Sequence, residues 1–314
     1  MVQQSIEQVL QPRSHLADHN RPMIYRIVHR TTCRYRHPVS VGKHVACLKP
    51  RSLPGQQLAQ SELHVQPTPA TMTERIDYFG NLLYFFTVQE PHKELVVEAR
   101  SEVRMLDDPT LGPQDSPPWE EAVRLLPTDQ SPAGLEAYQF RFESPRVKLR
   151  PEFAAYALQS FPPWRPMREG LLDLTARIHQ DFRFDSRVTN VRTTTEEVFR
   201  KRRGVCQDFA HLQIACLRSL NMSARYVSGY LRTHPPPGQP RLVGADASHA
   251  WMSAYCPGIG WIDFDPTNNV VPSNGHVTIA WGRDYGDVSP LHGLIQGGGV
   301  HDLSVSVDVE AVES

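Results

Sequence analysis

The amino-acid sequence predicts an α+β fold, in which an N-terminal antiparallel β-sandwich domain precedes a second domain of helices and strands. The first observation is a period-two alternation of apolar and polar residues in the N-terminal third, which is typical of strands with one solvated face. The second is a set of apolar stripes at steps of three and four in the second half of the chain, which indicates helices. The length of 314 residues allows two domains and a sizeable core.

The chain begins with a polar segment, residues 1–22, which we expect to form a disordered tail. This segment lacks the apolar stretch of a signal peptide, so the cytoplasm is the expected location.

Residues 23–106 are predicted to form the β-sandwich domain. The clearest strands are 24–34 and 95–103, where apolar residues alternate with arginine and glutamate. A hairpin turn is expected at Phe79-Gly80-Asn81. Six short strands with regular turns favour an antiparallel sandwich, for which we predict a structural or substrate-positioning role. The four shorter candidate strands are 41–48, 63–66, 71–77 and 82–88.

Residues 107–166 form a proline-rich connecting segment with eleven prolines. Such a composition is typical of a linker, but this segment is also rich in aromatic and aliphatic residues. We therefore expect it to pack on the second domain and to contain short helices near 118–126 and 151–160.

Residues 167–314 are predicted to form the second domain. Apolar stripes indicate helices over 168–182 and 205–220. Between them, Thr194-Thr195-Glu196-Glu197 is a capping-box pattern that begins another helix. Strands are expected at 277–282 and 303–309, with a loop at Gly297-Gly298-Gly299 between them.

The composition argues against several classes of function, namely nucleic-acid binding, membrane spanning, and metal or cofactor binding. The chain has 33 basic and 34 acidic residues, so no strong field attracts nucleic acid or an anionic membrane, and no apolar run is long enough to span a bilayer. The five cysteines form no C-x-x-C pair, so we expect no zinc or other metal site. No phosphate-binding P-loop follows the glycine run, and we expect no cofactor.

Three side chains stand in the order of a thiol nucleophile, a base and an orienting carboxylate. Cys206 is followed 43 residues later by His249 and a further 16 residues later by Asp265. A thiol needs a base to become a nucleophile at neutral pH, and the base needs an acceptor to orient it. These spacings suit residues that meet in the folded protein and do not share one helix.

The local context supports each role. Cys206 falls in the first turn of the predicted helix 205–220, where unpaired N–H groups and the helix dipole favour a thiolate. His249 lies on a predicted strand to residue 255, and Trp261 to Asp265 forms the returning strand. Alternation places Asp263 and Asp265 on the same face, so either aspartate could orient the histidine.

Each residue also has an ordinary structural interpretation. A single cysteine is more often a small buried hydrophobe than a nucleophile, and one of fourteen histidines is usually structural or solvated. Asp263 and Asp265 could be simple strand-end residues. The combination of all three, with the cysteine opening a helix, favours catalysis.

Four segments of this chain resemble the core of the transglutaminase-like superfamily, whose members have a papain-like fold. They are Gly204-Val205-Cys206-Gln207-Asp208-Phe209-Ala210-His211-Leu212, Ala224-Arg225-Tyr226-Val227-Ser228-Gly229-Tyr230, His249-Ala250-Trp251 and Gly260-Trp261-Ile262-Asp263-Phe264-Asp265-Pro266-Thr267-Asn268. The rest of the chain is similar to the bacterial cysteine protease and amidase branch, which carries an N-terminal β domain.

This resemblance implies that Cys206 is the nucleophile, His249 the base and Asp265, before a proline, the orienting carboxylate. It implies acyl transfer or hydrolysis at an amide of a peptide or protein through a thioester. Animal transglutaminases carry tryptophan directly after the nucleophile, where this chain has Gln207, so we expect hydrolysis or transpeptidation over protein cross-linking. The alternative is a binding or scaffolding module that retains the fold without turnover. Substrate identity and oligomeric state are not predicted.

Overall fold

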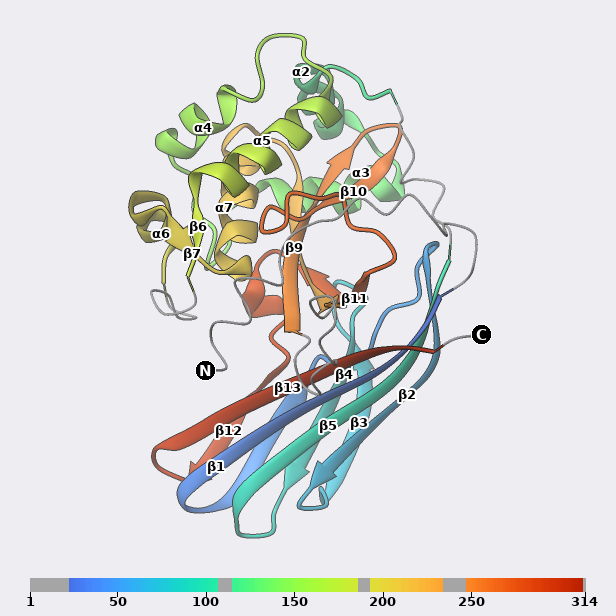
Figure 1. Cartoon of the computed structure of the whole chain (residues 1–314), viewed down its shortest axis with the longest axis vertical. Coiled ribbons are helices and arrows are strands. Elements are labelled where there is room, and N and C mark those ends of the chain that lie inside the picture. The colour runs from blue at the N-terminus through green and yellow to red at the C-terminus, as the bar shows by residue number, and fades with distance from the viewer. Residues whose placement is uncertain (1–22, 107–114, 186–192, 234–246, 313–314) are drawn as a thin grey trace, which may run out of the picture.

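The computed structural model describes residues 23–106, 115–185, 193–233 and 247–312. In Figure 1 a β-sheet region lies below a region of helices and shorter strands, as the sequence predicts. The predicted tail at 1–22 lies outside the described residues.

The first sheet is organised around one long strand, β1 (Met23–Ala46), which spans 24 residues. The sequence predicted two strands here, 24–34 and 41–48, because the alternation is interrupted near residue 38. The remaining N-terminal strands are β2 (Gln56–Gln66), β3 (Thr71–Ile76), β4 (Leu82–Val88) and β5 (His92–Met105). The sheet has the order β2-β5-β1-β4-β3, and β12 (Leu291–Gly297) and β13 (His301–Val312) also pair with β1.

The two halves of β1 belong to two layers. Residues 24–35 pair with β5 and β13, whereas the second half pairs with β4 and β12. Side chains from both halves form one apolar cluster, so the strands form a sandwich whose layers share β1. Its buried members are Cys33, Tyr35, Val39, Ala46, Leu48, Leu63, Tyr84, Phe86, Val88, Leu95, Val97 and Ala99.

The two C-terminal strands correct the predicted boundary of the second domain. We predicted that residues 167–314 form that domain, but β12 and β13 pair along β1 of the sandwich. The chain therefore leaves the sandwich after β5, builds the second domain and returns to complete both layers. Local alternation cannot show this return, because it does not name a strand's partner.

The second domain contains a sheet of order β10-β9-β8-β11. Its strands are β8 (Ala224–Leu231), β9 (Ala247–Cys256), β10 (Gly260–Phe264) and β11 (His276–Gly282), and the short β6 (Arg183–Phe184) and β7 (Arg203–Gly204) pair separately. The helices are α2 (Trp119–Leu125), α3 (Pro132–Tyr138), α4 (Pro151–Leu158), α5 (Met167–Asp181), α6 (Thr195–Lys201) and α7 (Cys206–Ser219). All the predicted helices are present, and α3 was not predicted.

Helix α7 is the central helix of this domain. Its residues from Asp208 to Arg218 are all buried, and it packs against β9 and α4. A helix that is buried all round needs its ends satisfied by side chains. At its last turn the carbonyl oxygens of Leu217 and Arg218 accept hydrogen bonds from the N–H groups of Met222 (3.0 Å) and Asn221 (2.9 Å), and the buried Arg218 side chain donates to the carbonyl oxygens of Ala224 and Arg283 in neighbouring segments.

The sandwich and the second domain share a continuous core. Tyr25, Ile27 and Val103 of the sandwich cluster with residues of α7 and β8. At the same junction Nδ1 of the buried His29 lies 2.9 Å from Oη of Tyr230. The inner face of the β13-β1-β5-β2 layer is therefore covered by the second domain at one end and by the other layer at the other end.

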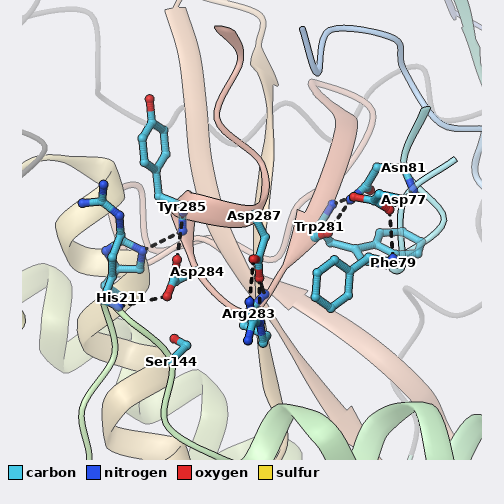
Figure 2. Close-up of polar contacts among 12 residues, drawn as sticks. Asp77, Phe79, Asn81, Ser144, His211, Trp281, Arg283, Asp284, Tyr285 and Asp287 are labelled. Atoms are coloured by element: carbon cyan, nitrogen blue, oxygen red, sulfur yellow. Dashed lines mark hydrogen bonds and ion pairs between the residues drawn. The ribbon is translucent and has the colours of Figure 1, made fainter. Parts of the chain in front are cut away.

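A polar network ties the β3–β4 turn to β11. Asn81 accepts a hydrogen bond from the Trp281 N–H (3.0 Å) and donates one to the Trp281 carbonyl (2.8 Å), as Figure 2 shows. Asp77 holds the Asn81 side chain at 2.8 Å. The sandwich thus fixes the end of β11, from which the chain continues toward the candidate site.

No helix of the described residues is long and apolar enough to cross a membrane.

Candidate active site

The start of α7 positions the Cys206 thiol. Val205 is extended (φ −116°) and Cys206 is the first helical residue. The carboxylate of Asp208 accepts a hydrogen bond from the Val205 N–H at 2.9 Å, which caps the helix start. All five cysteines lie in described residues, and Cys206 alone is partly exposed while the other four are buried. A reagent therefore has access to this thiol before the others.

His249 lies on β9 and Asp265 directly follows β10. Nε2 of His249 is 2.7 Å from Oδ2 of Asp265, whose side chain is fully buried. Asp263, the other aspartate that alternation left open, instead accepts a hydrogen bond from Nε1 of Trp251 at 2.8 Å. Of the two aspartates, Asp265 is therefore the one in contact with His249.

The third contact joins His249 to Cys206. The Cys206 side chain lies close enough to His249 to help raise the pKa of the imidazole. Because Nε2 of His249 is hydrogen-bonded to Asp265, Nδ1 is the ring nitrogen left for an interaction with the sulfur. The three residues that the sequence separates by 43 and 16 positions are therefore brought into one chain of contacts.

The charges and hydrogen bonds around His249 favour the protonated form of its imidazole. Burial by itself lowers the pKa of His249, but the charge and hydrogen bond of Asp265, together with the contact to Cys206, raise it to about 10. Burial alone would raise the pKa of Asp265, yet the His249 and His276 side chains hold it far below its ordinary value. At neutral pH the arrangement is an imidazolium between a carboxylate and the sulfur.

Sequence reasoning missed two residues of this site, His276 and Asn268. Nε2 of His276 lies 3.1 Å from Oδ2 of Asp265, and the Asn268 amide donates to the same oxygen at 2.7 Å. The other oxygen, Oδ1, accepts from the N–H groups of Thr267 (2.9 Å) and Asn268 (3.2 Å). His276 directly precedes the predicted strand 277–282, and nothing local distinguishes it among fourteen histidines. Asn268 lies within a family-like segment, where we gave it no role.

The Trp251 ring packs against the rings of both His249 and His276. Its ring centre is 6.1 Å from that of His249 and 5.2 Å from that of His276, and its side chain is fully buried. Gly229 on β8 pairs with His249 and makes room for this indole, because a Cβ there would lie 2.3 Å from the ring and 2.3 Å from the Val277 carbonyl oxygen. The glycine in the second family-like segment therefore has a packing reason.

Tyr285, in the segment after β11, packs against the main core, as Cys206 does, and is fixed by the network in Figure 2. The Tyr285 N–H donates to Nε2 of the buried His211 at 3.1 Å. Burial lowers the pKa of His211 to about 3, so this histidine stays neutral and can accept that bond. The neighbouring Asp284 accepts from the N–H groups of Arg146 (2.9 Å) and Gly286 (2.8 Å).

The donor set of His249, Asp265 and His276 also has the composition of a metal site. One ligand atom from each lies within 4.8 Å of the others. The same Nε2 and Oδ2 atoms form the hydrogen bonds described above, so a metal-bound form and the hydrogen-bonded form exclude each other. The sequence predicts no metal site. If a metal ion binds to the described residues, these three side chains are the ones that could hold it.

Comparison with known proteins identifies the family. Residues 25–104 match the model of the bacterial transglutaminase-like N-terminal region, and residues 163–266 match that of the transglutaminase-like superfamily. An uncharacterised protein of Mycobacterium tuberculosis (strain H37Rv) is 39% identical over 301 residues, which cover 92% of this chain and 93% of the relative.

The chain belongs to the transglutaminase-like superfamily. An uncharacterised protein of Mycobacterium leprae is 32% identical and covers 90% of this chain and 97% of its own length. The fold of a solved candidate cysteine protease from Cytophaga hutchinsonii is also similar, with a TM-score of 0.72 at 22% identity over 94% of this chain and 92% of that one. These matches confirm the predicted transglutaminase-like fold with its N-terminal sheet. Members of this superfamily often carry out cysteine-based acyl transfer or hydrolysis.

Proposed function

We propose that this protein is a cysteine-dependent enzyme that cleaves a peptide-like amide through a thioester on Cys206, with water as the usual acceptor. The observation that carries the proposal is the 2.7 Å contact between Nε2 of His249 and Oδ2 of Asp265, with the Cys206 side chain near enough to His249 to help raise its pKa. A thiol, a base and an orienting carboxylate in this order form the minimal set for nucleophilic catalysis at an acyl group.

In the first step the Cys206 sulfur attacks the carbonyl carbon of the substrate amide. The C–S bond forms, the carbonyl electrons move to oxygen, and the C–N bond breaks as the tetrahedral intermediate collapses. His249 gives the proton on Nδ1 to the departing amine. Asp265 keeps the imidazole ring in place and stabilises its charged form.

In the second step an acceptor resolves the thioester. His249 takes a proton from water, the resulting hydroxide oxygen attacks the acyl carbon, and the C–S bond breaks to release a carboxylic acid. An amine in place of water would give a new amide. A protein-glutamine gamma-glutamyltransferase of Pseudomonas aeruginosa is 36% identical over 76 residues, only 24% of this chain and 11% of that protein. This short match supports acyl chemistry without choosing the acceptor.

The oxyanion of the intermediate needs donors that point at it. Cys206 is the first residue of α7, so its N–H has no acceptor within the helix and can serve as one of them. Helix starts also favour negative charge.

The test is mass spectrometry of peptide libraries incubated with wild-type protein and with Cys206→Ala, with and without a primary amine. We expect peptides with new carboxyl termini from the wild-type protein only. Products in which the amine replaces the leaving group should form only when the amine is added, because it then competes with water. Identical product spectra for the two proteins would reject the enzyme and favour a binding or scaffolding module.

A further inference from the structure

A cavity of about 340 Å³ lies where the sandwich meets the second sheet. Residues 53–56 and 105–106 line it from the side of the sandwich, and residues of β8, β9, β10 and β11 line it from the second domain. Three of the five tryptophans of the chain, Trp251, Trp261 and Trp281, are among these lining residues. We name this space the junction cavity.

The junction cavity lies on the sheet face that carries His249. Arg225, which lines the cavity, pairs with Ser253 of β9, and Ser253 is on the same face of its strand as His249. His276 of β11 also lines the cavity, and its Nε2 atom lies 3.1 Å from Oδ2 of Asp265. One lining side chain therefore directly contacts the carboxylate that holds His249.

The cavity follows β11 along its length. His276, Thr278 and Trp281 all line it, and they share one face of the strand because the register with β8 shifts after Thr278. Five residues of extended chain span roughly 16 Å. An occupant that meets both His276 and Trp281 is therefore elongated.

The Trp281 end of the cavity holds buried hydrogen-bond donors without acceptors. Arg225 is 6% exposed, and its Nε atom has no hydrogen-bond partner among the described residues. The buried Arg218, in contrast, donates hydrogen bonds through all three of its side-chain nitrogens. Nε1 of Trp281 is buried without a partner in the same part of the structure. Such donors are costly unless a ligand or water meets them.

The faces of the Trp281 ring are already covered. The guanidinium carbon of Arg225 lies 3.7 Å from the centre of this ring, and that of Arg51 lies 3.5 Å from the same centre. Two groups so close to one ring lie on opposite faces of it. A sugar or an aromatic ligand therefore finds no stacking surface on Trp281, and what this residue has left to offer is its N–H group.

The charge of Arg225 is balanced by carboxylates. Burial lowers its pKa to about 9, while Asp263 and Glu136 favour its charged form. Glu136 lies 3.6 Å from Nη1 of Arg225, and Asp263 also lines the cavity. An anionic ligand at Arg225 would meet these two carboxylates, whereas a neutral carbonyl oxygen can accept from the unpaired donors without adding charge.

The other end of the cavity offers an acceptor. Nε2 of His276 faces the carboxylate of Asp265, so Nε2 carries the ring proton and Nδ1 of the neutral ring is an acceptor. This Nδ1 atom is also buried without a partner among the described residues. The cavity thus has unpaired donors at one end and an unpaired acceptor at the other. A peptide backbone carries both complementary groups, because each residue other than proline has a C=O and an N–H.

We propose that the junction cavity binds an extended, uncharged peptide segment of about five residues along β11. A carbonyl oxygen of the segment accepts hydrogen bonds from Arg225 and Trp281, and an N–H group near its other end donates to Nδ1 of His276. The bound segment then holds His276, and through it Asp265. For the role of this segment as part of the substrate the inference rests on the proposed function, to which it adds the place and the form of substrate binding.

The test follows the indole N–H signals of full-length Cys206→Ala, labelled with ¹⁵N-tryptophan, by NMR as blocked peptides are added. The signals are assigned by tryptophan-to-phenylalanine substitutions. The ligands are Ac-Ala-Ser-Ala-Ser-Ala-NH₂, the shorter Ac-Ala-Ser-NH₂ and the anionic Ac-Ala-Glu-Ala-Glu-Ala-NH₂. Trp119 and Trp164 do not line the cavity and serve as internal controls.

We expect the neutral pentapeptide to shift the Trp281 signal most and to leave the signals of Trp119 and Trp164 in place. The Trp251 signal should move less than that of Trp281, because its N–H already donates to Asp263. The Kd of the pentapeptide should be at least tenfold lower than that of the shorter peptide, and the anionic peptide should bind more weakly than the neutral one.

Two variants remove the site in different ways. Arg225→Met removes the guanidinium donors and should raise the Kd of the pentapeptide at least tenfold, which equals about 1.4 kcal/mol. Ser273→Trp fills the cavity from an exposed lining position and should have the same effect, which decides the matter where Arg225→Met does not fold. Ser304→Trp is the matched control, because Ser304 is exposed and does not line the cavity.

A pentapeptide that leaves the Trp281 signal in place, or that binds equally well to Ser273→Trp and to Ser304→Trp, overturns this inference. Tighter binding of the anionic peptide also overturns it, because the site would then be one for anions. Cleavage of peptides by the wild-type protein alongside either result leaves the proposed function intact. Binding at Trp281 by a protein whose wild type cleaves nothing supports the peptide site and rejects the proposed function.

Discussion

Replacing Asp265 by asparagine tests the electrostatic core of the site. The carboxylate is fully buried and accepts five hydrogen bonds, three on Oδ2 and two on Oδ1. Asparagine keeps the shape of the side chain but loses its negative charge. In place of one carboxylate oxygen it has an NH₂ group, which cannot accept the hydrogen bonds that this oxygen accepts. The substitution therefore removes the partner of the His249 imidazolium and leaves at least one buried N–H unpaired.

The magnitude follows from the pKa of His249. Its rise from 6.5 to about 10 corresponds to about 5 kcal/mol between the charged and neutral imidazole. Because the folded-state pKa is raised, this stabilisation is fully present below pH 6.5 and is lost as the pH rises to about 10. The lowered pKa of Asp265 gives the opposite dependence, since its stabilisation is present above pH 3.8 and is lost only in strong acid.

We therefore expect Asp265→Asn to lower the free energy of unfolding by about 3–5 kcal/mol at pH 6, the cost of breaking a buried ion pair. At pH 10 the loss should shrink to about 1–3 kcal/mol, the cost of an unpaired buried donor. Urea unfolding at both pH values measures these differences, and NMR titration of the histidines should place His249 of the variant well below 9.

Asp263→Asn is the matched control, because that side chain accepts one hydrogen bond, from Trp251, and asparagine still offers an acceptor. It also removes a negative charge that favours the charged form of the buried Arg225, so the readout for this control is the pKa of His249, which should stay near 10. A loss for Asp265→Asn that is equal at pH 6 and pH 10, or a His249 pKa that stays near 10 in the variant, would refute the reasoning.

Three further outcomes follow from the site. Cys206→Ala should abolish alkylation of the native protein by iodoacetamide at pH 6, since the other cysteines are buried; peptide mapping checks this, and equal labelling of the variant would contradict it. His276→Ala should lower kcat about tenfold with little change in KM, because Asp265 loses a hydrogen-bond donor. His276→Gln, which keeps a donor, should restore most of the kcat. A His276→Gln variant as slow as His276→Ala would indicate a purely steric role. Gly229→Ala should destabilise the fold by about 1–3 kcal/mol through its clash with Trp251, and an unchanged melting temperature would refute that packing.

Much of the local structure could be predicted from the sequence. The cap residue Thr194, the glycine before α7 and the apolar stripe of that helix are local signals, and the structure has α6 and α7 where they indicate. The glycine run at 297–299 ends β12 at Gly297 and forms the loop to β13, and all three residues have positive φ. These features depend on neighbours in the chain, which is why one sequence suffices to find them.

The parts that could not be predicted depend on contacts between distant segments. Strand partners decided that β12 and β13 belong to the sandwich, and alternation carries no information on partners. Alternation also left Asp263 and Asp265 equivalent, until the packing of Trp251 separated them. His276 was missed for the same reason, because its role arises only from a buried contact with Asp265.

The most direct test of the central claim is to look for the thioester itself. Wild-type protein is incubated with a peptide library, quenched in acid and digested. The mass of the peptide that contains Cys206 is then measured by mass spectrometry. We predict an acyl adduct on this peptide that neutral hydroxylamine removes and that His249→Ala does not accumulate. An adduct on any other residue, or amide cleavage that continues unchanged in Cys206→Ala, would contradict the account.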